Sequence, residues 1–152
     1  MKSKKLLLVL AMTVFFLVSS SVYAVDRDKE IAALADKAIA HILKVGRNQA
    51  FQDFADRKGE FFNGEVYIVV LDMDGINTFH PVNPRLVGKN FMNFKDTDGT
   101  LFIQEITSNL KQNGVTWVEY NWVNPIKKKV AKKRALAKMI DKKEYVLIGY
   151  WP

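Results

Sequence analysis

The sequence predicts an α+β domain in which a long N-terminal helix packs on an antiparallel sheet of about five strands. Apolar residues recur at three- and four-residue spacing over residues 31–45, which is the pattern of an amphipathic helix. Runs rich in β-branched and aromatic residues follow, and each run has the length of a strand. Because short turns join most of these runs, we expect hairpins and therefore antiparallel pairing.

The expected elements occur in the order helix, two strands, loop, short helix and three strands. Gly46 marks a break or bend in the helical region, which continues in phase to Phe54. A loop over residues 82–94 and a short helix over 100–113 cover one face of the sheet, and a gap beneath such a cover is a natural ligand pocket. The expected strands occupy residues 65–72, 76–81, 115–123, 135–140 and 145–151.

The segment Met1 to Ala24 predicts a cleavable secretory signal peptide. Three lysines precede an apolar run over residues 6–18, and small residues flank a cleavage position after Ala24. An uncleaved anchor is the alternative, although the run is short for a membrane span. The predicted domain is therefore residues 25–152, exported to the periplasm.

Composition supports export and narrows the classes of partner. The sequence has no Cys, so neither a lipid-modified Cys nor a disulfide framework is available, and a bacterial periplasm is the expected compartment. The formal net charge is +7, of which the signal segment carries three positive charges. The remaining basicity is concentrated after residue 126. We expect no nucleic-acid partner, since no recognised binding motif accompanies this basic run.

Two acidic segments resemble calcium loops but lack the required spacing. An EF-hand loop has Gly at its sixth position and a bidentate Glu at its twelfth. After Asp72 and Asp96, Gly comes fourth and the twelfth positions are Asn83 and Thr107. We therefore expect tight Asp-Gly turns, with Asp98 capping the following helix, and no metal site.

His80 ends the second expected strand and has two interpretations. It is either a hydrogen-bonded strand-end residue or a donor that points into the pocket. The only other His, His41, lies on the N-terminal helix, and no Cys or Gly-x-Ser-x-Gly motif supplies a nucleophile. The sequence therefore predicts neither a metal centre nor an enzyme, and it indicates no cofactor.

The strand over 115–123 places aromatic residues on both faces. Because strand side chains alternate, Tyr120 and Trp122 share one face and Trp117 lies on the other. By the same rule Lys133 and Arg134, where the next strand begins, point to opposite faces. One of the two can therefore reach inward, beside donors that suit a small carboxylate.

The lysine-rich segment 127–134 allows three interpretations. A solvated hairpin loop is the most ordinary one. The segment can also bind an acidic partner or an anionic membrane surface. The third interpretation is that one inward-facing cation belongs to a ligand pocket.

The ordered set of motifs resembles the single-Cache sensor domains, which are periplasmic, PAS-like modules. No one motif is specific, but their order and spacing are, and they cover the chain from about Phe61 onward. The motifs are Asp72 with Gly75, His80-Pro81, Leu86 to Lys89, Asp96 with Gly99, Tyr120 to Pro125, Lys133 to Lys138, and Tyr145 to Trp151.

The resemblance implies a PAS-like sheet and a pocket for a small organic anion such as a short carboxylate or amino acid. It implies that His80, Tyr120, Trp122 and Lys133 lie nearest this pocket. Relatives often carry Tyr where this chain has Leu136, so one hydroxyl is missing. Most relatives also continue into a membrane helix and signalling domain, so we expect this protein to depend on a membrane-bound sensor or transporter.

Overall fold

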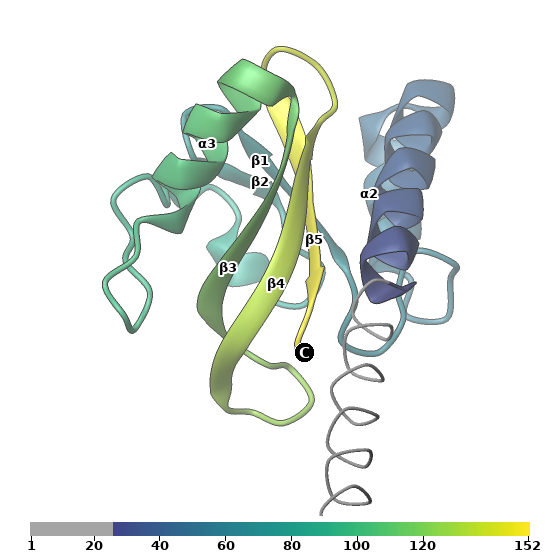
Figure 1. Cartoon of the computed structure of the whole chain (residues 1–152). Coiled ribbons are helices and arrows are strands. Elements are labelled where there is room, and N and C mark those ends of the chain that lie inside the picture. Colours follow the sequence, from purple (N-terminus) through teal and green to yellow (C-terminus); the bar gives the residue numbers. More distant parts are fainter. Residues whose placement is uncertain (1–25) are drawn as a thin grey trace, which may run out of the picture. The chain divides into compact units, whose positions relative to one another are not determined.

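The computed structural model describes residues 26–152, so the predicted signal peptide lies outside the described residues. Residues 31–152 form one compact unit. Its architecture is α+β, with a five-stranded antiparallel sheet that carries helices on both faces (Figure 1). This confirms the predicted fold class. None of the described helices is long and apolar enough to span a membrane.

Two consecutive helices cover one face of the sheet. The first occupies residues 26–45 and the second is α2 (Arg47–Ala55). Between them Gly46 adopts φ 80°, a conformation that residues with a Cβ rarely adopt, so the predicted break is confirmed. One buried stripe runs along both helices and consists of Ile31, Ala35, Ala38, Ile42, Ala50 and Phe54.

The sheet has the strand order β2-β1-β5-β4-β3, and every neighbouring pair is antiparallel. The last strand in the chain is therefore the central one, and all of its residues are buried. The strands are β1 (Ile68–Asp72), β2 (Asn77–Phe79), β3 (Val115–Val123), β4 (Val130–Met139) and β5 (Glu144–Tyr150).

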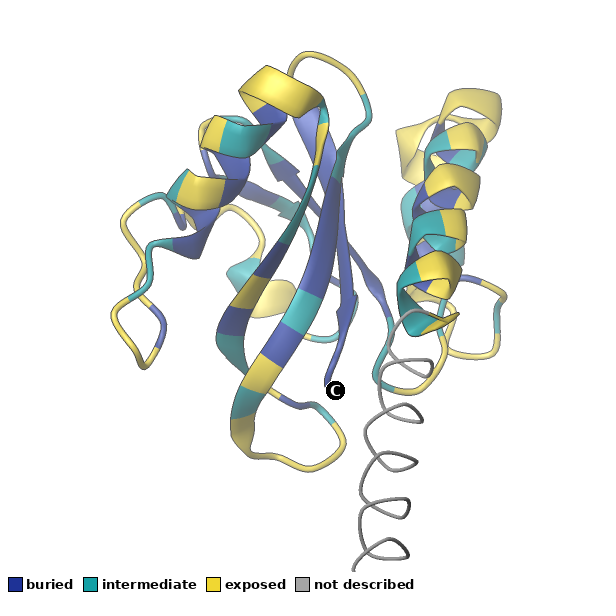
Figure 2. Ribbon diagram, viewed as in Figure 1, coloured by how far each residue is buried: buried dark blue, intermediate teal, exposed yellow. Residues whose placement is uncertain are grey.

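The alternation of strand side chains divides the core into two clusters, one on each face of the sheet. Ile68, Val70 and Ile148 pack toward the helices of residues 31–55. Tyr67, Val69 and Leu147 pack toward α3 (Phe102–Asn113) and the loop that precedes it. Figure 2 shows this buried sheet against the exposed outer faces of the helices.

The starts of two strands, β1 and β4, differ by several residues from the sequence predictions. β1 begins at Ile68 rather than Glu65, because Asn63 and Val66 exchange backbone hydrogen bonds in a tight turn. β4 begins at Val130 rather than Ala135, because its pairing with β3 continues to Val123. The lysine-rich segment 127–134 is therefore only partly a loop.

The predicted cap of the short helix was wrong. The N-cap residue of α3 is Leu101, which makes no side-chain capping hydrogen bond, so Asp98 does not cap this helix. The predicted end is confirmed, since Gly114 adopts a left-handed conformation there and its N–H donates to the Leu110 carbonyl.

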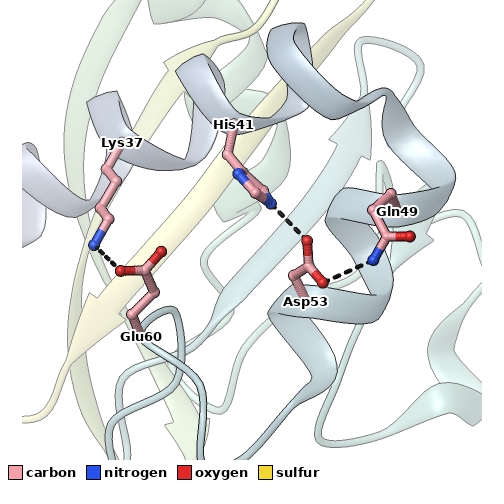
Figure 3. A network of polar contacts seen from close by, with 5 residues as sticks. All are labelled: Lys37, His41, Gln49, Asp53 and Glu60. Atoms are coloured by element: carbon pink, nitrogen blue, oxygen red, sulfur yellow. Dashed lines mark hydrogen bonds and ion pairs between the residues drawn. The ribbon is translucent and has the colours of Figure 1, made fainter.

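Polar contacts fasten the helical layer together outside the core (Figure 3). His41 lies 2.6 Å from an oxygen of Asp53, which also accepts a hydrogen bond from Gln49. The bond with His41 is the main reason that the pKa of Asp53 lies below its usual value. Lys37 pairs with Glu60 nearby. His41 therefore has its polar partner within the helical layer, on the opposite side of the sheet from the cavity described below.

We expect Gly149→Ala to destabilise the fold by about 1–3 kcal/mol. A Cβ at residue 149 would lie 2.7 Å from the Cβ of Ala135 and would also press on the Arg134 carbonyl, so β4 and β5 would have to separate. Urea unfolding of the two proteins measures the difference. Val123→Ala, at a half-exposed strand end, is the control, and we expect it to cost less than about 1 kcal/mol. An equal cost in both variants would contradict the packing argument.

Candidate functional site: a cavity between the sheet and α3

A small cavity lies on the α3 side of the sheet. Its volume is about 30 Å³, measured as the space open to the centre of a water molecule. This space is larger than one water molecule needs and too small for a ligand with a long chain. Val69, Leu71 and Leu147 of the sheet face it, and Leu86, Phe91, Phe102 and Ile103 come from the cover. Its polar and aromatic wall consists of Tyr67, Asn77, His80, Tyr120, Trp122 and Lys133.

The structure brings all four sequence-predicted site residues to this cavity. They come from the end of β2 (His80), from β3 (Tyr120 and Trp122) and from β4 (Lys133). Sequence reasoning missed Tyr67 and Asn77. Tyr67 lies two residues before Val69 in the same β run, so the period-2 rule could have found it. Asn77 carried no such signal, because a register shift in the pairing of β1 with β2 precedes it.

Lys133 is the inward-facing member of the Lys133–Arg134 pair. Its side chain is buried, and Nζ lies 4.3 Å from the ring centre of Tyr67 and 4.5 Å from that of Trp151. These are cation–π distances. Burial lowers the pKa of Lys133 to about 7, and the nearby carboxylate of Glu65 opposes this shift. The ammonium is therefore held in the wall by aromatic faces at considerable electrostatic cost.

Arg134 and Leu136 project from the opposite face of β4. The Arg134 guanidinium lies 4.7 Å from the ring centre of Trp117 and pairs with Glu119, so this cation does not belong to the cavity. Leu136 packs in the cluster beneath the helices of residues 31–55. The hydroxyl that the resemblance led us to expect at this position would therefore not face the cavity in this chain.

His80 presents a hydrogen-bond donor to the cavity. The Asn83 N–H donates to its Nδ1 at 3.1 Å, so the neutral ring carries its proton on Nε2. Burial lowers the pKa of His80 to about 4, and the charge of Lys133 adds to this effect. His80 is therefore hydrogen-bonded at the strand end and also borders the cavity.

Tyr120 and Trp122 form an aromatic wall with the cover. Tyr120 stacks on Phe102 with ring centres 4.1 Å apart and an interplanar angle of 4°. Burial raises the pKa of Tyr120 well above its usual value, so the phenol stays protonated and can donate. Trp122 meets Phe91 and Phe94 edge to face. This wall shields the polar groups from water.

The two acidic segments form turns, as the sequence predicts. Asp72 accepts hydrogen bonds from the backbone N–H groups of Asp74 and Ile76. Asp96 accepts from Asp98 and Thr100 with one oxygen. Its other oxygen accepts from the Asn121 N–H at 2.8 Å, which ties the cover to the edge strand β3. Within residues 26–152, no three His, Asp or Glu side chains come together in a way that could hold a metal ion.

The hairpin between β3 and β4 is a separate basic surface. Asn124 is buried and organises it by accepting from the backbone N–H groups of Ile126 and Lys127. The lysines of this turn are exposed, and three apolar side chains beside them are half exposed or more: Val123, Ile126 and Val130.

Comparison with known proteins places this architecture in a family. The model of the family described as Single Cache domain 2 matches residues 35–149, and the chain belongs to this family. The predicted resemblance is therefore confirmed. A comparison with the curated proteins gave no match.

Three solved structures have similar folds. A methyl-accepting chemotaxis protein from Vibrio parahaemolyticus RIMD 2210633 is 24% identical with a TM-score of 0.75, over 89% of this chain and 95% of that one. A periplasmic sensor domain of a chemotaxis protein is 20% identical with a TM-score of 0.67, over 89% and 96%. A Cache chemosensory domain, described for its carboxylic acid recognition, is 19% identical with a TM-score of 0.71, over 87% and 97%.

We expect His80 to remain neutral with its proton on Nε2 down to about pH 4. Nitrogen-15 NMR of the ring measures both the tautomer and the midpoint. Because the folded pKa lies below the ordinary value of 6.5, the linked stability is complete above pH 6.5 and is lost as pH falls toward 4. His80→Gln should remove this part of the acid dependence of unfolding. A midpoint near 6.5, or a proton on Nδ1, would contradict the burial and the Asn83 hydrogen bond.

Proposed function

We propose that this protein is an exported, periplasmic sensor-type domain that binds a small organic anion, most simply a short carboxylate, without catalysing a reaction. The observation that carries the proposal is the buried ammonium of Lys133 in the wall of a small aromatic cavity. A buried cation costs free energy unless a counter-charge or a function accompanies it. The nearby carboxylate of Glu65 offsets part of this cost, and a carboxylate in the cavity would add to that counter-charge.

Five of the six polar and aromatic wall residues have a role in this account. Lys133 supplies the charge, and the Nε2–H of His80 and the hydroxyl of Tyr120 donate directional hydrogen bonds to the carboxylate oxygens. Trp122 and Phe102 close the apolar end and keep the interactions in a medium of low dielectric. Tyr67 holds the ammonium through its ring face. The small volume restricts the ligand to a short chain.

The family supports this assignment at a coarse level. Two of the solved relatives are chemotaxis proteins or their sensor domains, and a third is a Cache domain described for carboxylic acid recognition. We infer that Met1 to Ala24 directs export, and that a membrane-bound sensor or transporter receives the signal. The known class of the relatives also favours binding over catalysis.

We expect Lys133→Ala to weaken carboxylate binding by more than tenfold, because it removes the only charge that the wall residues supply. A thermal-shift screen of short carboxylates and amino acids identifies the ligand, since a bound ligand raises the apparent stability. Titration calorimetry then compares the variants. Lys128→Ala, which removes an exposed lysine of the hairpin, is the matched control and should change affinity little.

A second candidate function would produce a different result in the same experiment. The hairpin combines exposed lysines with exposed Val123, Ile126 and Val130, so it can dock on an acidic partner or an anionic membrane. Equal losses in Lys133→Ala and Lys128→Ala, with binding that weakens steeply as salt rises, would count against the cavity and favour this surface.

We expect affinity for the carboxylate to fall as pH rises above about 7. The pKa of Lys133 is lowered to about 7 in the free protein, so its protonated fraction falls about tenfold per pH unit above that value. A bound carboxylate raises this pKa, so binding takes up a proton in that range. Calorimetry in buffers of different ionisation enthalpy measures the uptake. Affinity that stays constant from pH 6 to pH 9 would contradict a role for the Lys133 charge.

A further inference from the structure

The cavity wall contains a polar residue that the binding scheme above does not use, Asn77, whose side-chain oxygen is buried without a partner. Asn77 lines the cavity and is only 4% exposed. No donor among the described residues reaches its Oδ1. The backbone beneath it is fixed at both groups, since its N–H donates to the Lys89 carbonyl at 2.9 Å and its carbonyl accepts from the Gly88 N–H at 2.8 Å.

An unpaired acceptor at this place needs an explanation. Nearly all buried polar atoms in folded proteins have a partner, and leaving one without a partner costs about 1–3 kcal/mol. In residues 26–152 one other buried side-chain atom shares this condition, the hydroxyl of Tyr145. Tyr145 does not line the cavity, whereas Asn77 does, so of these two residues only Asn77 borders the space that a ligand would occupy.

Among the other polar groups of the wall, Lys133 and His80 act only as donors, while the hydroxyls of Tyr67 and Tyr120 can donate or accept. The ammonium of Lys133 has no acceptor capacity, and a neutral imidazole that accepts on Nδ1 can only donate from Nε2. These groups complement the oxygens of a carboxylate. The Asn77 oxygen does not complement a carboxylate, because this oxygen and the carboxylate oxygens are all acceptors and repel each other. It requires a proton donor on another part of the ligand.

We propose that the cavity selects short hydroxycarboxylates, whose carboxylate meets Lys133 and His80 while the hydroxyl donates to the Oδ1 of Asn77. The inference rests on the carboxylate site proposed above and names the class of ligand that it takes. An amino acid also carries a donor, but its ammonium would bury a second cation in the cavity that already holds Lys133. A plain carboxylate of the same size leaves the Asn77 oxygen unpaired.

Three probes of nearly the same size separate these classes: glycolate, propionate and glycine. They share a carboxylate and differ in a terminal hydroxyl, methyl or ammonium group. Titration calorimetry on the protein should show glycolate binding at least about fivefold more tightly than propionate, which is the range of one neutral hydrogen bond, and glycine most weakly. In Asn77→Leu, which removes the acceptor at similar volume, the preference for glycolate should disappear while propionate binds as well or better.

Two outcomes would overturn this inference and leave the carboxylate site intact. One is equal affinity for glycolate and propionate, or tightest binding of glycine, with each affinity still lost in Lys133→Ala. The other is a preference for glycolate that survives in Asn77→Leu. Binding of all three probes that is independent of Lys133, or no binding at all, would overturn both proposals.

A stability measurement checks that the variant is folded and tests the same claim. Because Leu in place of Asn77 removes an unpaired buried oxygen, the unfolding temperature without ligand should be equal or higher. Asn77→Ala is the second variant, with the acceptor also removed and more space left. If both variants bind glycolate as the wild type does, Asn77 has no part in selection.

Discussion

The burial of the Lys133 ammonium group is the constraint on which the structure of this cavity depends. Lys133 lies within the sheet, away from bulk water, and burial lowers its pKa to about 7. The structure limits this cost with the ring faces of Tyr67 and Trp151 and with the nearby charge of Glu65. Lys133 and these partners come from three separate regions of the chain, residues 65–67, Lys133 and Trp151, which only the folded sheet brings together. The charge therefore depends on the complete fold, and the cavity chemistry depends on the charge.

The cover over this charge is held together, and is joined to the sheet and its turn, by hydrogen bonds between side chains and backbone groups as well as by apolar packing. Asp96 joins the turn before α3 to β3, and Gln104 of α3 donates to the Met92 carbonyl in the loop. Asn90 donates to the Asp74 carbonyl in the β1–β2 turn. Each of these hydrogen bonds contributes only modestly to stability. Together they hold the aromatic cover in place over the ligand site.

Much of the fold followed from the sequence because its signals are local. The helical stripe, Gly46, the strand runs and Gly114 all act through their immediate neighbours. The boundaries of β4 were wrong because strand pairing with β3, a long-range contact, extends it to Val130. The capping role of Asp98 was wrong because its backbone N–H is bound by Asp96 in a turn that ends before the helix begins.

The site residues also divide into those that local sequence patterns predict and those whose placement depends on long-range packing. Alternation put Tyr120 with Trp122 on one face, but it left open whether Lys133 or Arg134 points inward, since that choice depends on packing across the whole sheet. No sequence pattern indicated that Asn77 would line the cavity. Its position follows from a register shift between β1 and β2, and its significance follows from the absence of a donor among the described residues.

The place of Lys133 within a run of three cations has a structural consequence. Lys132 and Arg134 flank it, so a slip of β4 by one residue would still turn a positive charge toward α3. The same slip would turn Leu136 from the cluster under the helices of residues 31–55 toward α3 and would carry Ala135 and Ala137 the other way, because every side chain of the strand would change faces. The apolar residues of β4 therefore fix the register of this strand, because its run of charged residues alone would fit more than one register.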